Sequence, residues 1–263
     1  MVKQTTILDF QTKCDQGEKI AIVTAYDYAM ALAVDAAGVD AVLVGDSLST
    51  TMLGRISTLS TTVEEMVHHC KAVVKGVKKA LVIGDLPFLS YQLGPETALI
   101  NAGRLMAETG VGAVKLEWCP RAPEVTEFLV QNGIPTMGHV GFTPQQLHQL
   151  GGYRVQGKDK VSVARLHKQA KAFEKAGAFA VVLELVPPEV SRSISKVLKI
   201  PTIGIGAGPH CDGQVQVLHD LLGLLPDFHP KHAKAYLKLH GAITEAVRQY
   251  TREVKAGKFR PGA

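Results

Sequence analysis

Short apolar segments alternate with segments of helical periodicity along most of the 263-residue chain. The intervening segments, among them 62–77, 95–110 and 163–177, repeat their apolar residues every three to four positions, as amphipathic helices do. The predicted strands are 19–25, 40–45, 80–84, 112–117, 134–139, 178–184 and 200–206, with a weaker eighth near 213–220. Strands that alternate with helices of this length predict βαβ units and a parallel sheet.

Eight such units favour an α/β fold of the closed (β/α)8 TIM-barrel type over an open sheet. An open dinucleotide-binding sheet begins with a glycine-rich loop after its first strand, whereas here the first strand runs into "TAYDYAMA" at 24–31. No linker rich in Pro, Gly or Ser interrupts the chain. We therefore expect one barrel domain over 1–263, with an N-terminal arm and one or two closing helices within 229–257.

Composition narrows the class of protein. The chain is 46% hydrophobic, enough for one substantial core, and no apolar run approaches the ~18 residues of a membrane span. The N-terminus has no apolar stretch of the kind found in signal peptides. The four cysteines are far apart and form no C-x-x-C motif. They indicate reduced thiols and a cytoplasmic protein.

The formal net charge of +5 raises the question of nucleic acid. The densest basic cluster, "KAVVKGVKK" at 71–79, spaces its lysines as a solvated helix face does, without interleaved aromatic residues. Attraction of an anionic small molecule is the alternative interpretation. We expect neither nucleic acid nor a membrane as partner.

Ionisable residues gather at the predicted strand ends, where (β/α)8 enzymes hold their active sites. Lys115 and Glu117 are two residues apart on one strand and so share a face, which we expect to point inward. Taken alone, an Asp after Gly is a common turn or cap residue, and a single His is commonly structural. The glycines of "GIGAG" at 204–208 suit either an anion or a tight turn. The candidates are Asp46, Asp85, Lys115, Glu117, His139 and Glu184.

Taken together, four carboxylates on one rim would repel one another unless a cation compensated them. Oxygen ligands without cysteine or paired histidines favour Mg²⁺ over zinc. We expect Asp46 and Asp85 as direct ligands, Glu117 as a ligand directly or through water, and Glu184 as a general base. His68 and His69 are adjacent on a predicted helix and diverge by about 100°, so they cannot form a metal pair.

Several motifs, in order, resemble the ketopantoate hydroxymethyltransferase family (3-methyl-2-oxobutanoate hydroxymethyltransferases) over about 24–250. The motifs are "TAYDYAMA", "LVGDSL", "GDLPFLSYQ", "AVKLE", "GHVGFTPQ", "GGYRVQGK", "GIGAGPHCDGQVQVLHDLLG" and "PKHAKAY". The resemblance implies a barrel of the phosphoenolpyruvate mutase/isocitrate lyase-like superfamily. It also implies a homo-oligomer, commonly a decamer.

The resemblance implies roles for individual residues. Metal-binding acids fall on Asp46, Asp85 and Glu117, and the proton acceptor falls on Glu184. The substrate-binding residues fall on Asp46, Ser47, Asp85, Lys115 and His139. The implied reaction transfers a hydroxymethyl group from 5,10-methylenetetrahydrofolate to 3-methyl-2-oxobutanoate through a Mg-stabilised enolate, giving ketopantoate (2-dehydropantoate) for pantothenate biosynthesis.

The chain departs from the family pattern at "STTMLGRISTLSTT" (49–62), at Trp118 and Cys119, and at His232. None of these positions carries a metal or base role. One alternative function is a lyase of the phosphoenolpyruvate mutase type, but the cysteine-containing loop motif of that group is absent from the sequence. A catalytically silent barrel that binds keto acids is another. The long connection 140–160, with "GGYRVQGK", is predicted to be a lid or a crossing loop.

Overall fold

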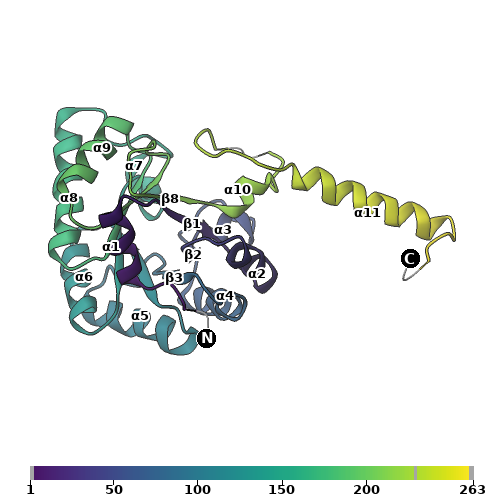
Figure 1. Cartoon of the computed structure of the whole chain (residues 1–263), viewed down its shortest axis with the longest axis horizontal. Coiled ribbons are helices and arrows are strands. Elements are labelled where there is room, and N and C mark those ends of the chain that lie inside the picture. Colours follow the sequence, from purple (N-terminus) through teal and green to yellow (C-terminus); the bar gives the residue numbers. More distant parts are fainter. Residues whose placement is uncertain (1–2, 228–229, 261–263) are drawn as a thin grey trace. The chain divides into compact units, whose positions relative to one another are not determined.

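The computed structural model describes residues 3–227 and 230–260, and it divides into two compact units, Met1–Gln216 and Val217–Ala263 (Figure 1). The first unit is a closed barrel of eight parallel strands in sequence order. The strands are β1 (Ile20–Thr24), β2 (Ala41–Val44), β3 (Leu81–Asp85), β4 (Ala113–Glu117), β5 (Thr136–Gly141), β6 (Ala180–Glu184), β7 (Thr202–Ile205) and β8 (Gly213–Gln216). The predicted (β/α)8 barrel is confirmed, whereas the single domain over 1–263 stays a prediction.

Helices surround the strands of the first unit (Figure 1). They are α1 (Ile7–Gln16), α2 (Tyr28–Ala36), α3 (Leu48–Thr51), α4 (Val63–Gly76), α5 (Pro95–Thr109), α6 (Ala122–Gln131), η1 (Pro144–Gln146), α7 (Leu147–Leu150), α8 (Lys160–Lys175) and α9 (Pro188–Val197). Helix α4 packs on β2 and β3, α5 on β4, α6 on β5, and α8 on β5 and β6. The predicted amphipathic segments 62–77, 95–110 and 163–177 correspond to α4, α5 and α8.

The inside of the barrel is apolar at the amino ends of the strands. Ile22, Ile83 and Met137 point into this core, and Phe10 of α1 joins them with no exposed surface. The Phe10 ring meets Phe179 edge to face, with centroids 5.6 Å apart. The predicted N-terminal arm is therefore a helix that covers this end of the barrel and leaves the carboxyl ends of the strands for polar chemistry.

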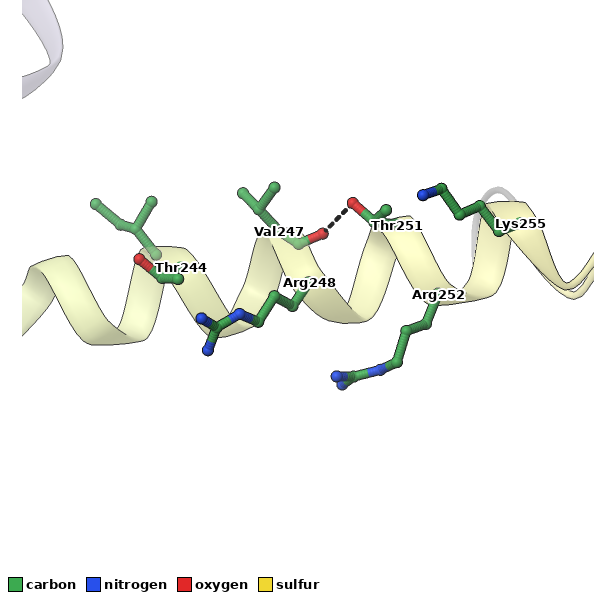
Figure 2. Close-up of a pocket in the computed structure, with 7 residues that line it drawn as sticks. Thr244, Val247, Arg248, Thr251, Arg252 and Lys255 are labelled. Carbon is green, nitrogen blue, oxygen red and sulfur yellow. Dashed lines mark hydrogen bonds between the residues drawn. The ribbon is translucent and has the colours of Figure 1, made fainter.

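The second unit contains α10 (Leu218–Leu222) and α11 (Leu239–Lys255), and α11 falls in the segment where closing helices are predicted. Ile243, Val247, Tyr250 and Val254 recur every three to four residues along α11 and are about half exposed. Figure 2 shows side chains of this helix that line a pocket, among them Val247 and Thr251, and the Thr251 hydroxyl donates a 2.7 Å hydrogen bond to the Val247 carbonyl. Helix α11 therefore carries an unburied apolar stripe.

Two predictions from composition, on the cysteines and on membrane spans, can be compared with the structure. Cys14, Cys70, Cys119 and Cys211 are free thiols, as the spacing of the cysteines indicates. The part of the chain that the structure describes contains no helix long and apolar enough to cross a membrane.

A buried carboxylate fixes the entry to β3. Asp35, at the end of α2, is only 6% exposed and accepts backbone N–H bonds from Lys78, Lys79 and Ala80 at 2.8–3.0 Å. Burial opposes ionisation, but these three donors outweigh it and hold the pKa of Asp35 below its usual value. The turn before β3 thus depends on one ionised side chain.

We expect Asp35→Ala to lower the free energy of unfolding by about 2–4 kcal/mol, because three largely buried N–H groups lose their acceptor. Urea unfolding measures this loss. The exposed Asp15→Ala is the control and should cost no more than about 0.5 kcal/mol. Since the folded pKa lies below the unfolded one, the contribution is present above about pH 4 and fades as the pH falls through the folded pKa. Equal losses in the two variants would contradict this role.

Candidate active site

Strand register brings the predicted site residues together. Asp85 at the end of β3 pairs with Lys115 of β4, Glu117 of β4 pairs with His139 of β5, and Glu184 of β6 pairs with Gly141. Asp46 lies two residues after the end of β2, which pairs with β3. All six predicted ionisable residues therefore lie at the carboxyl ends of five consecutive strands.

Asp85 is the central acceptor of the site. Its Oδ1 atom lies 2.7 Å from Lys115 Nζ, and its Oδ2 atom accepts the Asp46 backbone N–H at 3.0 Å. The residues Asp46, Asp85 and Lys115 are at most 5% exposed. Since a buried charge is costly unless it is paired, Lys115 partly supplies the compensation that the sequence suggested would come from a divalent cation alone.

One lysine is too little positive charge for the acids around it. Burial, and then the charge of Asp85, raise the pKa of Asp46 to about 7. Burial and the Asp46 charge likewise raise the pKa of Glu117 well above its usual value. Although burial lowers the pKa of Lys115, the surrounding carboxylates raise it overall, so this side chain stays charged. Lys115 alone therefore leaves the ionisation of these buried acids costly.

The tautomer of His139 follows from its neighbours. Burial and the Lys115 charge lower the pKa of His139 well below its usual value, so the ring is neutral. Lys115 Nζ, which can only donate, lies 3.5 Å from His139 Nδ1. This contact favours a ring proton on Nε2, which lies 3.2 Å from Glu184 Oε2 but is not aligned with it for a hydrogen bond. Lys115, His139 and Glu184 thus form a polar path, with one unaligned step, toward the partly exposed end of the site.

Gln145 connects two of the acids and was not among the predicted site residues. Its side-chain amide donates to Asp46 Oδ2 at 2.9 Å, and its backbone N–H donates to Glu117 Oε2 at 3.0 Å. Buried Tyr91 donates to Gln145 Oε1 at 2.8 Å and so orients the amide. Both residues stand inside quoted motifs, "GDLPFLSYQ" and "GHVGFTPQ", but Gln and Tyr are too common in loops for residue type to have marked them.

Ser47 follows Asp46 at the start of α3 and lies at the edge of the site. Its hydroxyl is 2.8 Å from the hydroxyl of buried Tyr26. Tyr26 stays protonated because burial raises its pKa to about 12. The backbone carbonyl of Tyr26 lies 2.6 Å from His69 Nδ1. His69 therefore has a structural contact, which agrees with the structural role expected for His68 and His69.

Two unusual backbone positions flank Glu184. Gly141 has φ +101°, and a Cβ there would lie 2.2 Å from the Glu184 carbonyl oxygen, so only glycine fits. Leu185 has φ +46°, an uncommon conformation for a residue with a side chain. Strain of this kind is found where surrounding structure holds a side chain in a required direction.

The altered segment 49–62 adjoins the acidic cluster at one point, where the buried Thr61 hydroxyl donates to the Asp46 carbonyl at 3.5 Å. Arg55 donates to both carboxylate oxygens of Glu65 in α4, and Ile56 is 98% exposed. In the "GIGAG" loop, a Cβ on Gly208 would lie 2.7 Å from Pro188 of α9, so a tight approach explains this glycine. His232 lies in the second unit.

The donor set fits a hard cation. Asp85 Oδ1 is buried without a well-aligned hydrogen-bond donor among the described residues, and Asp46 lies beside it with a raised pKa. Paired carboxylate oxygens without sulfur suit Mg²⁺, which takes one or two protein carboxylates and completes its shell with water and substrate. Residues 3–227 and 230–260 contain no group of three or more His, Cys, Asp or Glu side chains that could hold a metal ion. A two-carboxylate site remains compatible with the geometry.

Solved structures share the fold. A phosphonopyruvate hydrolase complex with oxalate and Mg²⁺ matches with a TM-score of 0.63 and 13% identity, covering 100% of this chain and 90% of that one. A 2,3-dimethylmalate lyase of the phosphoenolpyruvate mutase/isocitrate lyase superfamily matches with a TM-score of 0.60 and 18% identity at the same coverage. These likenesses show that the chain shares their barrel fold.

Curated relatives are far more similar in sequence. A 3-methyl-2-oxobutanoate hydroxymethyltransferase of Dehalococcoides mccartyi (strain CBDB1) is 52% identical over 97% of this chain and 92% of its own length. A protein of the same name from Chloroflexus aurantiacus (strain ATCC 29366 / DSM 635 / J-10-fl) is 53% identical over 98% of this chain and 90% of its own length. The family model for ketopantoate hydroxymethyltransferase matches residues 4–262. The chain therefore belongs to the ketopantoate hydroxymethyltransferase family.

Proposed function

We propose that this protein transfers a hydroxymethyl group from 5,10-methylenetetrahydrofolate to 3-methyl-2-oxobutanoate, giving ketopantoate for pantothenate biosynthesis. Relatives with about 50% identity over nearly the whole chain carry the corresponding name. The observation that carries the proposal is the Glu184–His139–Lys115 path beside the buried Asp46 and Asp85 pair. That arrangement combines a base with groups that bind an anionic keto acid.

Mg²⁺ is the proposed metal, held by Asp46 and Asp85, with Glu117 as a ligand through water. Glu117 already accepts the Gln145 N–H, which favours the indirect role. When bound, the metal supplies Lewis-acid polarisation of the keto group. Lys115 compensates negative charge around the substrate, Ser47 donates to its carboxylate, and His139 orients it.

Glu184 is the proposed general base. It is the least buried of the four acids, with 14% of its side chain exposed, so it can face substrate at the mouth. Glu184 takes the proton from C3 of the keto acid while the neutral His139 Nε2–H lies beside its carboxylate. The electron pair of the broken C–H bond forms the new C–C bond to the one-carbon unit. Water supplies the hydroxyl oxygen, and tetrahydrofolate leaves.

The direct experiment incubates the purified protein with 3-methyl-2-oxobutanoate, methylenetetrahydrofolate and Mg²⁺ and follows ketopantoate by NMR. We expect product with Mg²⁺, none after chelation by EDTA, and recovery when Mg²⁺ is restored. Asp85→Asn should need at least tenfold more Mg²⁺ for half-maximal rate, while the exposed Asp15→Asn should titrate like the unmodified protein. Cleavage of a C–C bond without ketopantoate would instead indicate a lyase.

Glu184→Gln should abolish exchange of the C3 proton of the keto acid with deuterium oxide, a loss of at least about 10²-fold, because the amide cannot accept that proton. Binding of the keto acid, measured by calorimetry, should stay within a few fold. Glu189→Gln, an exposed change on α9, is the matched control and should exchange normally. Normal exchange in Glu184→Gln would remove this residue from the base role.

We also propose a cytoplasmic homo-oligomer, a decamer by family resemblance. The four free thiols suit a reducing compartment, and the apolar stripe on α11 offers surface for self-association. Sedimentation equilibrium should give a mass near ten chains for the unmodified protein and a smaller species for Val247→Asp. Gln249→Asp, an exposed change on the same helix, is the control. A monomer at micromolar concentration would contradict the proposal.

A further inference from the structure

Tyr153 is an aromatic side chain at the mouth of the site that no step above uses. It stands in the "GGYRVQGK" loop, and 59% of it is exposed. One side of its ring packs on the fully buried Phe142, with centroids 4.8 Å apart and ring planes inclined by 34°. More than half of the residue therefore stays exposed to solvent, although its ring contacts a buried partner.

Two hydrogen bonds connect this part of the chain to the proposed base. The Phe142 backbone N–H donates to the Glu184 carbonyl at 2.8 Å, and the Gln156 N–H donates to the Leu185 carbonyl at 2.8 Å. The loop is therefore attached on one side of Tyr153 through Phe142 and on the other through Gln156. Both attachments end at the strained junction of Glu184 and Leu185.

The charges of the acids reach Tyr153. Burial, followed by the charges of Glu184, Asp46 and Glu117, raises the pKa of Tyr153. Arg154, the next residue, is exposed and has no carboxylate partner among the described residues. The loop thus presents an aromatic ring and a cation beside the site.

We propose that Tyr153 is the stacking residue for the bicyclic ring of the one-carbon donor, an inference that rests on the proposed function. The keto acid is too small to need the buried carboxylates, Lys115 and an exposed aromatic ring at once. A folate-type donor is larger, carries a flat heterocycle, and ends in an anionic tail that suits Arg154. An aromatic ring held at the mouth by a buried partner stacks on such a heterocycle with little loss of side-chain freedom.

This placement also means that proton removal and one-carbon transfer use different residues. A donor stacked on Tyr153 lies over Phe142, whose backbone is bonded to the residue that removes the proton. The one-carbon unit then reaches the keto acid from the open side of the site, opposite the buried Asp46 and Asp85. Proton removal itself needs only the keto acid, the metal and Glu184, so the two half-reactions depend on different residues.

The test measures the two half-reactions separately. Tyr153→Ala should raise KM for methylenetetrahydrofolate about tenfold or more, as loss of stacking on an aromatic ring typically does. Exchange of the C3 proton, run without the donor, should stay within twofold of the unmodified protein. Tyr153→Phe should keep the donor KM within about threefold. Tyr153→Leu preserves an apolar contact with Phe142 and should behave like Tyr153→Ala, which separates stacking from loop collapse.

Val155→Ala, in the same loop, is the matched control and should change neither half-reaction by more than twofold. Calorimetry with tetrahydrofolate gives a readout that does not depend on turnover. If the unmodified protein makes no ketopantoate, the proposed function fails. Weaker tetrahydrofolate binding by Tyr153→Ala would still support the stacking role. Equal tetrahydrofolate binding by both proteins, no binding by either, or a slowed proton exchange in Tyr153→Ala overturns it.

Discussion

The structure of the site depends on an imbalance of charge in a place that water barely reaches. Asp46, Asp85 and Glu117 are almost fully buried, and among the described residues Lys115 is the one ammonium group placed with them. Removing several carboxylates from water is tolerated only if cations or protons compensate them. The raised pKa values of Asp46 and Glu117 express that need. A divalent cation would satisfy the same need without protonating the acids.

The barrel makes this concentration of charge possible because each strand contributes a side chain at the same end. Register sets Asp85 beside Lys115 and Glu117 beside His139, so opposite charges and polar groups alternate around the rim. The other end of the barrel is apolar and covered by Phe10. Glu184 differs from the other acids in being less buried, and its position depends on the glycine at 141 and on the strained Leu185. The difference in burial therefore separates the proposed base, Glu184, from the more deeply buried acids.

Much of this arrangement could be predicted from sequence because the apolar runs of a parallel barrel are easily recognised and their ends converge. The strands, the inward direction of Lys115 and Glu117, and the gathering of Asp46, Asp85, His139 and Glu184 at one rim agree with the structure. Gln145 and Tyr91 were missed because their importance comes from long-range hydrogen bonds between loops. The pairing of Lys115 with Asp85 depends on register, and periodicity does not determine register.

The most direct test of the account is a crystal structure of the protein with Mg²⁺ and 3-methyl-2-oxobutanoate. We expect a cation coordinated by Asp46 and Asp85, with the carboxylate and keto oxygens of the substrate in its remaining positions and the Glu184 carboxylate facing C3. A keto acid bound away from this rim, or a cation held by other side chains, would contradict the claim that compensation of the buried acids organises the site.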